Sequence, residues 1–235
     1  MSSKEATKEK KPLWREILEW VLSIICAFFL AVTIKYFVFT PTLVMQNSMT
    51  PTILNGERVL INRLVRTFNL EINRGDIVTL EAPISNDSEY NELLKNGDTV
   101  KALYRDVNGV FQKFVYYVVE YNKISYIKRV IAIEGDHVVI KDGKLYVNDE
   151  LQVEDYIPKG VLTNITKSSS YITNDFIVPE GYYFCMGDNR EASSDCRTFG
   201  CVPKEKIEGK VVCRIWPLTK FGKVGPASDI EKYAK

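Results

Sequence analysis

The sequence has almost no histidine: His137 is the only one in 235 residues. A Ser-His-Asp or Cys-His catalytic arrangement would therefore have to use this single side chain. His137 follows Gly135 and Asp136 at the head of a predicted strand, which favours an exposed structural residue. Because the chain also lacks an HExxH motif, a zinc hydrolase is disfavoured, and we expect no metal and no other cofactor.

Paired cysteines are lacking as well. The chain has no CxxC pair and no zinc-finger spacing among Cys26, Cys185, Cys196, Cys201 and Cys213. Cys196 and Cys201 are close enough in sequence to form a disulfide. Two unpaired, partly buried thiols are the favoured interpretation.

Neither sign of charge dominates, because the chain has 31 Lys and Arg residues and 30 Asp and Glu residues, for a net charge of +1. This balance gives none of the basic field that nucleic-acid-binding proteins use, so we expect no nucleic-acid partner. The sequence also lacks internal repeats and helices of the length that βαβ units need. The apolar fraction of 46% suits a globular core.

A long apolar run is present at residues 20–39, interrupted only by Ser23, Thr33 and Lys35. As a helix, 20 residues span about 30 Å, the thickness of the hydrocarbon core of a bilayer. A cleaved secretory signal would have a shorter core and an Ala-x-Ala-like site, and neither is found here. A buried core helix would show a polar stripe, which is also absent. The run therefore predicts a membrane anchor.

Basic residues indicate how the anchor is oriented. Five of them precede the apolar run, and the next basic residue after it is Arg58; the five are Lys4, Lys8, Lys10, Lys11 and Arg15. Since positive charge stays on the cytoplasmic side, we expect the N-terminus inside and the rest of the chain outside. The first 12 residues are charged and polar, which predicts disorder.

The remainder of the chain is rich in β-branched and aromatic residues. Strands are predicted within ERVLINRLV, GDIVTLEAP, FQKFVYYVVEY and SYIKRVIAI. HVVIKDGKLYV predicts a hairpin, with Asp142-Gly143 supplying the positive φ angles of a two-residue turn. Polar stretches at 85–98 and 158–175 read as loops or insertions. The predicted fold is mostly β and antiparallel, behind one N-terminal transmembrane helix.

Three segments carry candidate chemistry. Ser48 lies nine residues beyond the apolar run, among apolar neighbours that a solvated linker would not usually have. Lys128 interrupts a β-branched strand, and alternation places it on one face with Tyr126 and Val130. The third segment is a polar turn between apolar strands, from Gly187 to Arg197.

These segments, in this order, resemble the boxes of type I signal peptidases. The boxes are Ser48-Met49-Thr50-Pro51-Thr52, Arg74-Gly75-Asp76-Ile77-Val78, Lys128-Arg129-Val130-Ile131 with the following Gly135-Asp136, and Gly187 to Arg197. The resemblance runs from the anchor to about Trp216. Four boxes in order behind a membrane anchor are far more specific than any one of them alone.

The resemblance implies a role for each matching residue. Ser48 would attack the scissile carbonyl, Lys128 would remove its proton, and Ser193 would orient the lysine amine. Asp195 and Arg197 would form a structural ion pair, and Asp188 and Arg190 would shape the turn. Small side chains of the substrate would bind in pockets lined by Met49, Tyr126 and Ile127.

The resemblance also implies a domain plan and a substrate. Residues 1–16 would be a cytoplasmic polar tail, 17–39 the anchor in the cell membrane, and 40–235 an extracytoplasmic peptidase domain. Insertions are expected around 85–123 and 150–175, with an antiparallel catalytic core that carries a smaller inserted β subdomain. The expected partners are the lipid bilayer and the signal peptides of preproteins, cut after small residues in an Ala-x-Ala-like pattern.

The sequence departs from the family pattern at three positions. Ala132 replaces a usual glycine and Glu134 a usual proline, and both changes fall at the end of the lysine strand. Gln46 stands where some members carry Ser or Gly, so a serine hydroxyl is lacking there for the oxyanion hole. The backbone N–H of Ser48 would still serve, and the Gln46 amide is a candidate second donor.

A lysine acts as a general base only when it is neutral. In water its pKa is near about 10.4, so burial has to lower that value to roughly 8. Two alternatives to the peptidase remain. LexA-like Ser-Lys proteases are soluble and carry a DNA-binding domain, unlike this chain. A non-catalytic membrane-tethered binding module would be expected to lose Ser48, Lys128 or Ser193, and all three are present.

Overall fold

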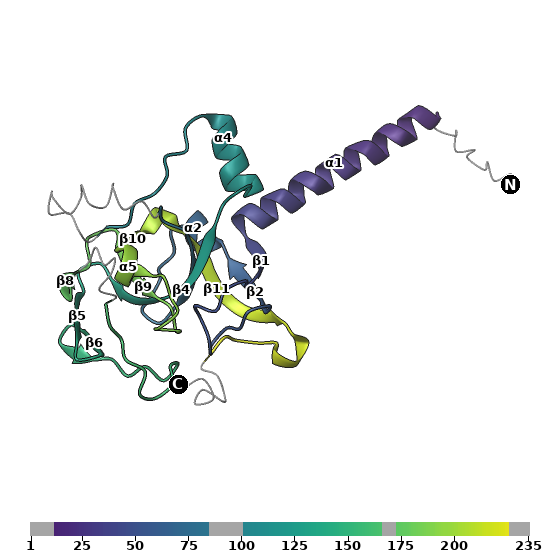
Figure 1. Cartoon of the computed structure of the whole chain (residues 1–235). Coiled ribbons are helices and arrows are strands. Elements are labelled where there is room, and N and C mark those ends of the chain that lie inside the picture. The colour runs from purple at the N-terminus through teal and green to yellow at the C-terminus, as the bar shows by residue number, and fades with distance from the viewer. Residues whose placement is uncertain (1–11, 85–100, 166–172, 226–235) are drawn as a thin grey trace, which may run out of the picture.

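The structure is a computed structural model that describes residues 12–84, 101–165 and 173–225 (Figure 1). The predicted disorder of the N-terminal residues up to 11 and the predicted insertion at 85–98 lie outside these ranges, as does part of the insertion at 158–175. Within them, one long helix projects from a β domain.

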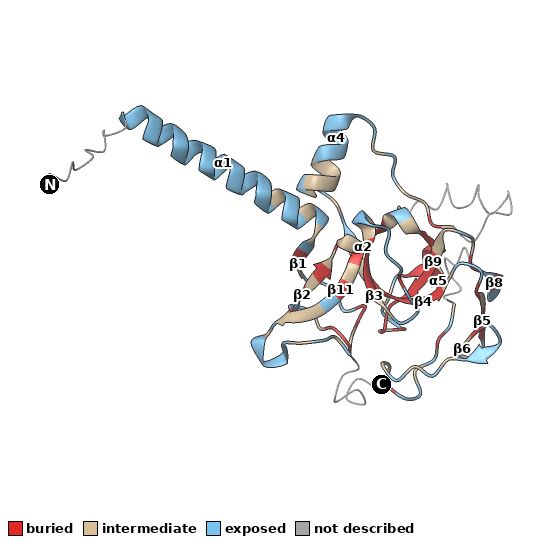
Figure 2. Ribbon diagram, turned by 180° about the vertical axis from the view of Figure 1, so that it is seen from behind, coloured by how far each residue is buried: buried red, intermediate tan, exposed pale blue. Residues whose placement is uncertain are grey.

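The projecting helix is α1, Leu13–Phe37, with 25 residues. It starts before the predicted apolar run and ends two residues before the end of that run. Its hydroxyl groups are satisfied inside the helix, since Ser23 donates to the carbonyl of Glu19 and Thr33 to that of Phe29. Its most apolar 18-residue window has a mean hydropathy of 2.4, and none of that window is buried. Figure 2 shows its exposed surface on every turn.

The domain is built on a seven-stranded antiparallel sheet of order β1-β2-β11-β3-β4-β9-β10. Its strands are β1 Phe39–Leu43, β2 Arg58–Asn62, β3 Ile77–Glu81, β4 Ser125–Ile133, β9 Tyr182–Met186, β10 Val202–Pro203 and β11 Ile207–Trp216. Between β4 and β9, which are neighbours in this sheet, the chain forms a second sheet of order β7-β6-β5-β8. Its strands are β5 His137–Lys141, β6 Lys144–Val147, β7 Glu150–Leu151 and β8 Asp175–Ile177. The predicted antiparallel fold with a smaller inserted β subdomain is confirmed.

The predicted hairpin is confirmed as β5 and β6. Asp142 and Gly143 connect the two strands with φ angles of 52° and 74°. Both angles lie in the left-handed region that an Asp-Gly turn accommodates. Four other short helices are α2 Leu64–Thr67, α5 Cys196–Phe199, η2 Lys204–Lys206 and η3 Leu218–Lys220.

The strand predicted within FQKFVYYVVEY is wrong. These residues form helix α4, Val110–Phe114, which continues into a π-helical turn, η1, Val115–Val119. The C-terminal half of this helical segment is fixed by tertiary contacts. The Tyr116 hydroxyl donates to Glu81, and Glu120, which follows η1, pairs with Lys35. Strand propensity reflects packing in a sheet, and β3 already has β11 and β4 on its two sides.

Two clusters of buried apolar side chains hold the large sheet. The larger one includes Val78, Leu80, Val130, Phe184 and Met186. The smaller one includes Met49, Ile53, Val59, Ile61 and Ile77. The loop that contains Ser48 is therefore part of the core.

Candidate active site

Lys128 lies in the middle of β4, paired in register with Val78 of β3. Its side chain is only 1% exposed, although a lysine is rarely buried. The ammonium nitrogen Nζ lies 3.2 Å from Oγ of Ser193 and 5.2 Å from the ring centroid of Tyr126. A titratable amine is thus held in a dry place beside a hydroxyl.

Burial changes the protonation of this amine. Removal from water lowers the pKa of Lys128 from 10.5 to about 8, while the negative charge of Asp195 opposes the change. With a pKa of about 8, about a tenth of the molecules carry a neutral amine at pH 7, against fewer than about one in a thousand for a solvated lysine. The side chain is therefore prepared to accept a proton near neutral pH.

Ser48 lies in the loop between β1 and β2 and is 7% exposed. The backbone N–H of Asn189 donates to the carbonyl oxygen of Ser48 at 3.0 Å, and the Asn189 side-chain amide donates to the carbonyl oxygen of Asn47 at 3.2 Å. The Thr52 hydroxyl donates to the carboxylate of Asp188. Three polar contacts thus attach the Ser48 loop to the turn that follows β9.

Gly187 allows the backbone of Ser48 and the side chain of Ser193 to lie close together. A Cβ atom at this position would overlap both the side chain of Ser193 and the carbonyl oxygen of Ser48. Only a residue without a side chain allows the two segments to approach this closely. The backbone of Ser48 and the side chain of Ser193 therefore both adjoin Gly187, and Ser193 in turn contacts Lys128, although the three residues come from separate parts of the chain.

Asp195 and Arg197 form a buried clamp behind the turn. The Arg197 guanidinium donates to the Asp195 carboxylate from Nε at 2.9 Å and from Nη2 at 2.8 Å. The N–H of Gly187 donates to the same carboxylate at 2.9 Å. Burial alone would raise the pKa of Asp195, but the hydrogen bonds and charge of Arg197 hold it below its usual value. The carboxylate therefore stays ionised beside Lys128.

Asp188 and Arg190 flank the turn with separate partners. Asp188 accepts two hydrogen bonds from the Arg129 guanidinium, at 2.9 and 2.7 Å. Arg190 binds the carboxylate of Glu154, which belongs to the insertion between β4 and β9. The ring of Tyr156, from the same insertion, lies 3.9 Å below the Arg129 guanidinium. The loop that follows β7 thus supports the turn through Glu154 and Tyr156.

The predicted substrate-lining residues divide between the two apolar clusters. Met49 is buried in the smaller cluster, and Ile127 packs against that cluster. Tyr126 packs against the larger cluster and stacks on Phe199, with the ring centroids 6.4 Å apart. Gln46 is exposed, two residues before Ser48.

Several residues in the site region were missed by sequence reasoning. Glu154 and Tyr156 lie in an insertion whose sequence carries no recognisable motif. Asn189 lies inside the Gly187–Arg197 box, and its distance from Asn47 in the sequence hides their contact. The Arg74 guanidinium binds Asp136, which ties the second family box to the end of β4.

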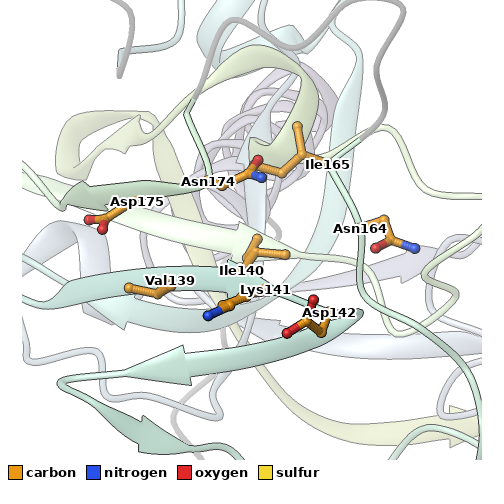
Figure 3. Close-up of a pocket in the computed structure, with 8 residues that line it drawn as sticks. All are labelled: Val139, Ile140, Lys141, Asp142, Asn164, Ile165, Asn174 and Asp175. Carbon is orange, nitrogen blue, oxygen red and sulfur yellow. The ribbon is translucent and has the colours of Figure 1, made fainter.

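The remaining sequence candidates lie apart from this centre. His137 is partly exposed at the start of β5 and pairs with Asp175, with Nε2 2.8 Å from the carboxylate. Cys196 and Cys201 are free thiols, as favoured from the sequence, but they are fully buried. A hollow of about 550 Å³ lies on the second sheet, and its lining includes Val139, Lys141, Asn174 and Asp175 (Figure 3). None of the predicted site residues lines this hollow.

Comparison with known proteins identifies relatives of this chain. The family described as "Signal peptidase, peptidase S26" matches residues 17–216. Signal peptidase IB of Staphylococcus aureus (strain COL) is 33% identical over 221 residues, which cover 88% of this chain and 93% of that protein. Signal peptidase I S of Bacillus subtilis (strain 168) is 32% identical over 227 residues, covering 95% of this chain and 99% of that one.

Among solved structures, a signal peptidase I from Enterococcus faecalis V583 is 24% identical, with a TM-score of 0.34. The match covers 60% of this chain and 97% of that one. The family match covers most of the sequence, and the chain belongs to the signal peptidase family, peptidase S26. It is accordingly a serine protease.

Proposed function

We propose that the protein is a membrane-anchored endopeptidase that removes signal peptides from preproteins, with Ser48 as nucleophile and Lys128 as general base. One observation carries this proposal. The amine of Lys128 is buried, its pKa is lowered to about 8, and it contacts Ser193 on the turn that touches Ser48. A neutral amine at this place has the properties of a general base.

The reaction would proceed in two stages. The neutral Lys128 amine takes the Ser48 hydroxyl proton while Oγ attacks the scissile carbonyl. The resulting ammonium then gives that proton to the leaving amine, and an acyl-enzyme remains on Ser48. In the second stage Lys128 takes a proton from water, the hydroxide releases the signal peptide as a carboxylic acid, and Ser48 recovers its proton.

Ser193 would orient the lysine amine through its hydrogen bond of 3.2 Å. The backbone N–H of Ser48 would stabilise the oxyanion. This N–H belongs to the peptide unit whose carbonyl, at Asn47, accepts a hydrogen bond from Asn189. The Gln46 amide is the candidate second donor, and unchanged turnover after Gln46→Ala would remove it from this role.

Membrane anchoring by α1 supports the choice of substrate. Ser48 follows the last residue of α1, Phe37, by 11 residues, so the site would lie close to the outer bilayer surface. With the N-terminus on the cytoplasmic side, it would meet a signal peptide whose apolar core is still in the membrane. Small residues before the cut would enter pockets near Met49, Tyr126 and Ile127.

The test is cleavage of a preprotein in detergent micelles by the full chain, with Ser48→Ala and Lys128→Met as matched variants. We expect the parent to cut after an Ala-x-Ala sequence, as read by N-terminal sequencing of the product, and both variants to be inactive. A bulky residue in place of the last alanine should prevent the cut. Binding without cleavage by the parent would instead indicate a tethered binding module, and activity in Lys128→Met would remove the lysine from the mechanism.

A further inference from the structure

The helical segment Val110–Val119, made of α4 and η1, presents apolar side chains to solvent. Val110 is 88% exposed and Phe111 77%, and Phe114 and Val119 are also exposed. Neither α4 nor η1 contains a buried residue. A surface helix of a soluble domain normally turns its apolar stripe toward the core, and a large exposed apolar patch marks an interaction surface.

The segment is amphipathic along its length. Apolar residues follow one another at a spacing of four: Val110, Phe114 and Val118 in one row, and Phe111 and Val115 in the next. Residues at this spacing share one face of a helix. The polar side chains between these rows belong to Gln112, Lys113, Tyr116 and Tyr117. This composition is that of a helix lying at a membrane interface.

Ion pairs fix the segment to the end of α1. Glu120, which directly follows η1, lies 3.1 Å from Nζ of Lys35 in the last turn of α1. The same carboxylate binds the guanidinium of Arg63, which is almost fully buried. The end of the exposed helix is therefore held at the level where α1 meets the domain.

The orientation of α4 relative to α1 is consistent with a position at the membrane surface. In Figures 1 and 2, α4 stands beside the C-terminal end of α1 and runs across the axis of α1 instead of along it. If α1 crosses a bilayer, a helix placed in this way lies along the bilayer surface. The exposed residues 110–114 then lie at the end of the segment that is farther from α1, and the partly buried residues 115–118 lie nearer to it.

We infer that α4 and η1 form a second membrane contact, with the apolar side chains inserted among the lipid headgroups. The inference rests on the anchoring of α1 described under the proposed function. Two points of attachment would limit rotation of the domain about α1 and so fix the distance of Ser48 from the lipid. The recognised surface is the bilayer itself, because Glu120 ties the segment to the last turn of the helix that would cross it.

Tryptophan fluorescence tests this contact without requiring proteolysis. The full chain would be reconstituted into vesicles of phosphatidylcholine and phosphatidylglycerol, with and without bromine on the lipid acyl chains near the headgroups. Phe111→Trp adds one indole to the native Trp14, Trp20 and Trp216. We expect the added emission to be quenched by brominated lipid as strongly as the parental emission.

The matched control is Val153→Trp, an 89% exposed position two residues beyond β7. The sheet of β7 lies at the far end of the domain from α1 (Figure 1), so its added emission should escape quenching. Quenching of the parent but not of the Phe111→Trp increment would overturn the membrane contact and leave the anchor intact. An unquenched parent would overturn both. Quenching of the control as well would show unspecific adsorption of the whole domain and would also overturn the inference.

Discussion

At the scale of single residues, the free-energy cost of burying an ammonium group determines the protonation state of Lys128. The pKa is lowered from 10.5 to about 8, mainly because the ammonium loses its water. A change of about 2.5 pKa units corresponds to about 3.4 kcal/mol of differential interaction between the two protonation states. The fold tolerates a destabilised cation at this position, as functional sites often do.

Activity should therefore depend on pH through this amine. We expect kcat/KM to rise with pH on the acid side, with an apparent pKa near 8, because only the neutral amine accepts the Ser48 proton. The measurement is cleavage of a preprotein in detergent between about pH 6 and pH 10, a range that spans the lowered value. Lys128→Arg should be inactive throughout, since a guanidinium keeps its proton. An acid limb near the pKa of a free lysine would contradict this assignment.

Stability should depend on the same group. The unfolded chain binds the lysine proton up to about pH 10.5, and the folded chain releases it near pH 8, so the free energy of unfolding rises with pH between these values. Lys128→Met lacks this penalty. Relative to the parent, we expect the variant to gain up to about 3 kcal/mol below pH 8 and to lose that gain above pH 10.5. Denaturant titrations of both chains in detergent would measure the difference, and a difference that does not vary with pH would count against a buried cation.

At the scale of elements, the turn after β9 determines whether the parts of the site meet. Gly187 lies between Ser193 and the carbonyl of Ser48, with no room for a Cβ. Gly187→Ala should therefore push the two segments apart and lower kcat by about a hundredfold or more, as misplaced catalytic groups do. KM should change little, because the overlap is with the Ser48 and Ser193 segments. Normal turnover by a folded Gly187→Ala chain would show that this approach is not needed.

The buried clamp in the same turn gives a second prediction. Asp195→Asn leaves the Arg197 guanidinium without its charge partner, which should cost about 3–5 kcal/mol of stability. It should also move the acid limb of the pH profile below 8, because the charge of Asp195 favours the Lys128 ammonium. Thermal unfolding and the pH profile measure the two effects separately. A destabilised chain with an unmoved acid limb would limit the clamp to a structural role.

The sequence predicted the candidate site residues better than it predicted the elements and contacts around them. Ser48, Lys128 and Ser193 stand in short boxes whose spacing is local; the structure places the Ser48 backbone and the Ser193 side chain beside Gly187, and Ser193 against Lys128. The ion pair of Arg190 with Glu154 could not be predicted from the sequence. The two residues are far apart in the chain, and their charges alone do not indicate which acidic residue Arg190 would bind. The strand predicted over α4 was wrong because strand propensity reflects packing against neighbouring strands, and β3 already pairs with β11 and β4 on its two sides.

At the scale of the whole molecule, Glu120 couples the domain to its helix. It contacts Lys35 of α1 and Arg63, which follows β2. Burial alone would raise the pKa of Glu120, but the bonds to Arg63 and Lys35 hold it below its usual value, so the coupling persists near neutral pH.

Removing this carboxylate should loosen α4 without touching the site. Charge-assisted hydrogen bonds contribute about 1.5–3 kcal/mol, so Glu120→Gln should speed hydrogen exchange of residues 110–119 by about tenfold or more. Turnover of a short soluble peptide should stay at the parental value. Exchange measured by mass spectrometry on the full chain reports the change, and Glu134→Gln, at an exposed pair with Lys204, is a matched control. Equal exchange in the two variants would mean that Glu120 does not hold the segment.

The large sheet places β4 beside β9, with the whole second sheet between them in the chain. During synthesis the lysine strand therefore emerges long before the strand that covers it, and pairing across such a distance is slow. The contact of the Lys128 amine with Ser193 can form only after the turn that follows β9 has been made. The order of the strands therefore places the completion of the site after the synthesis of the whole second sheet.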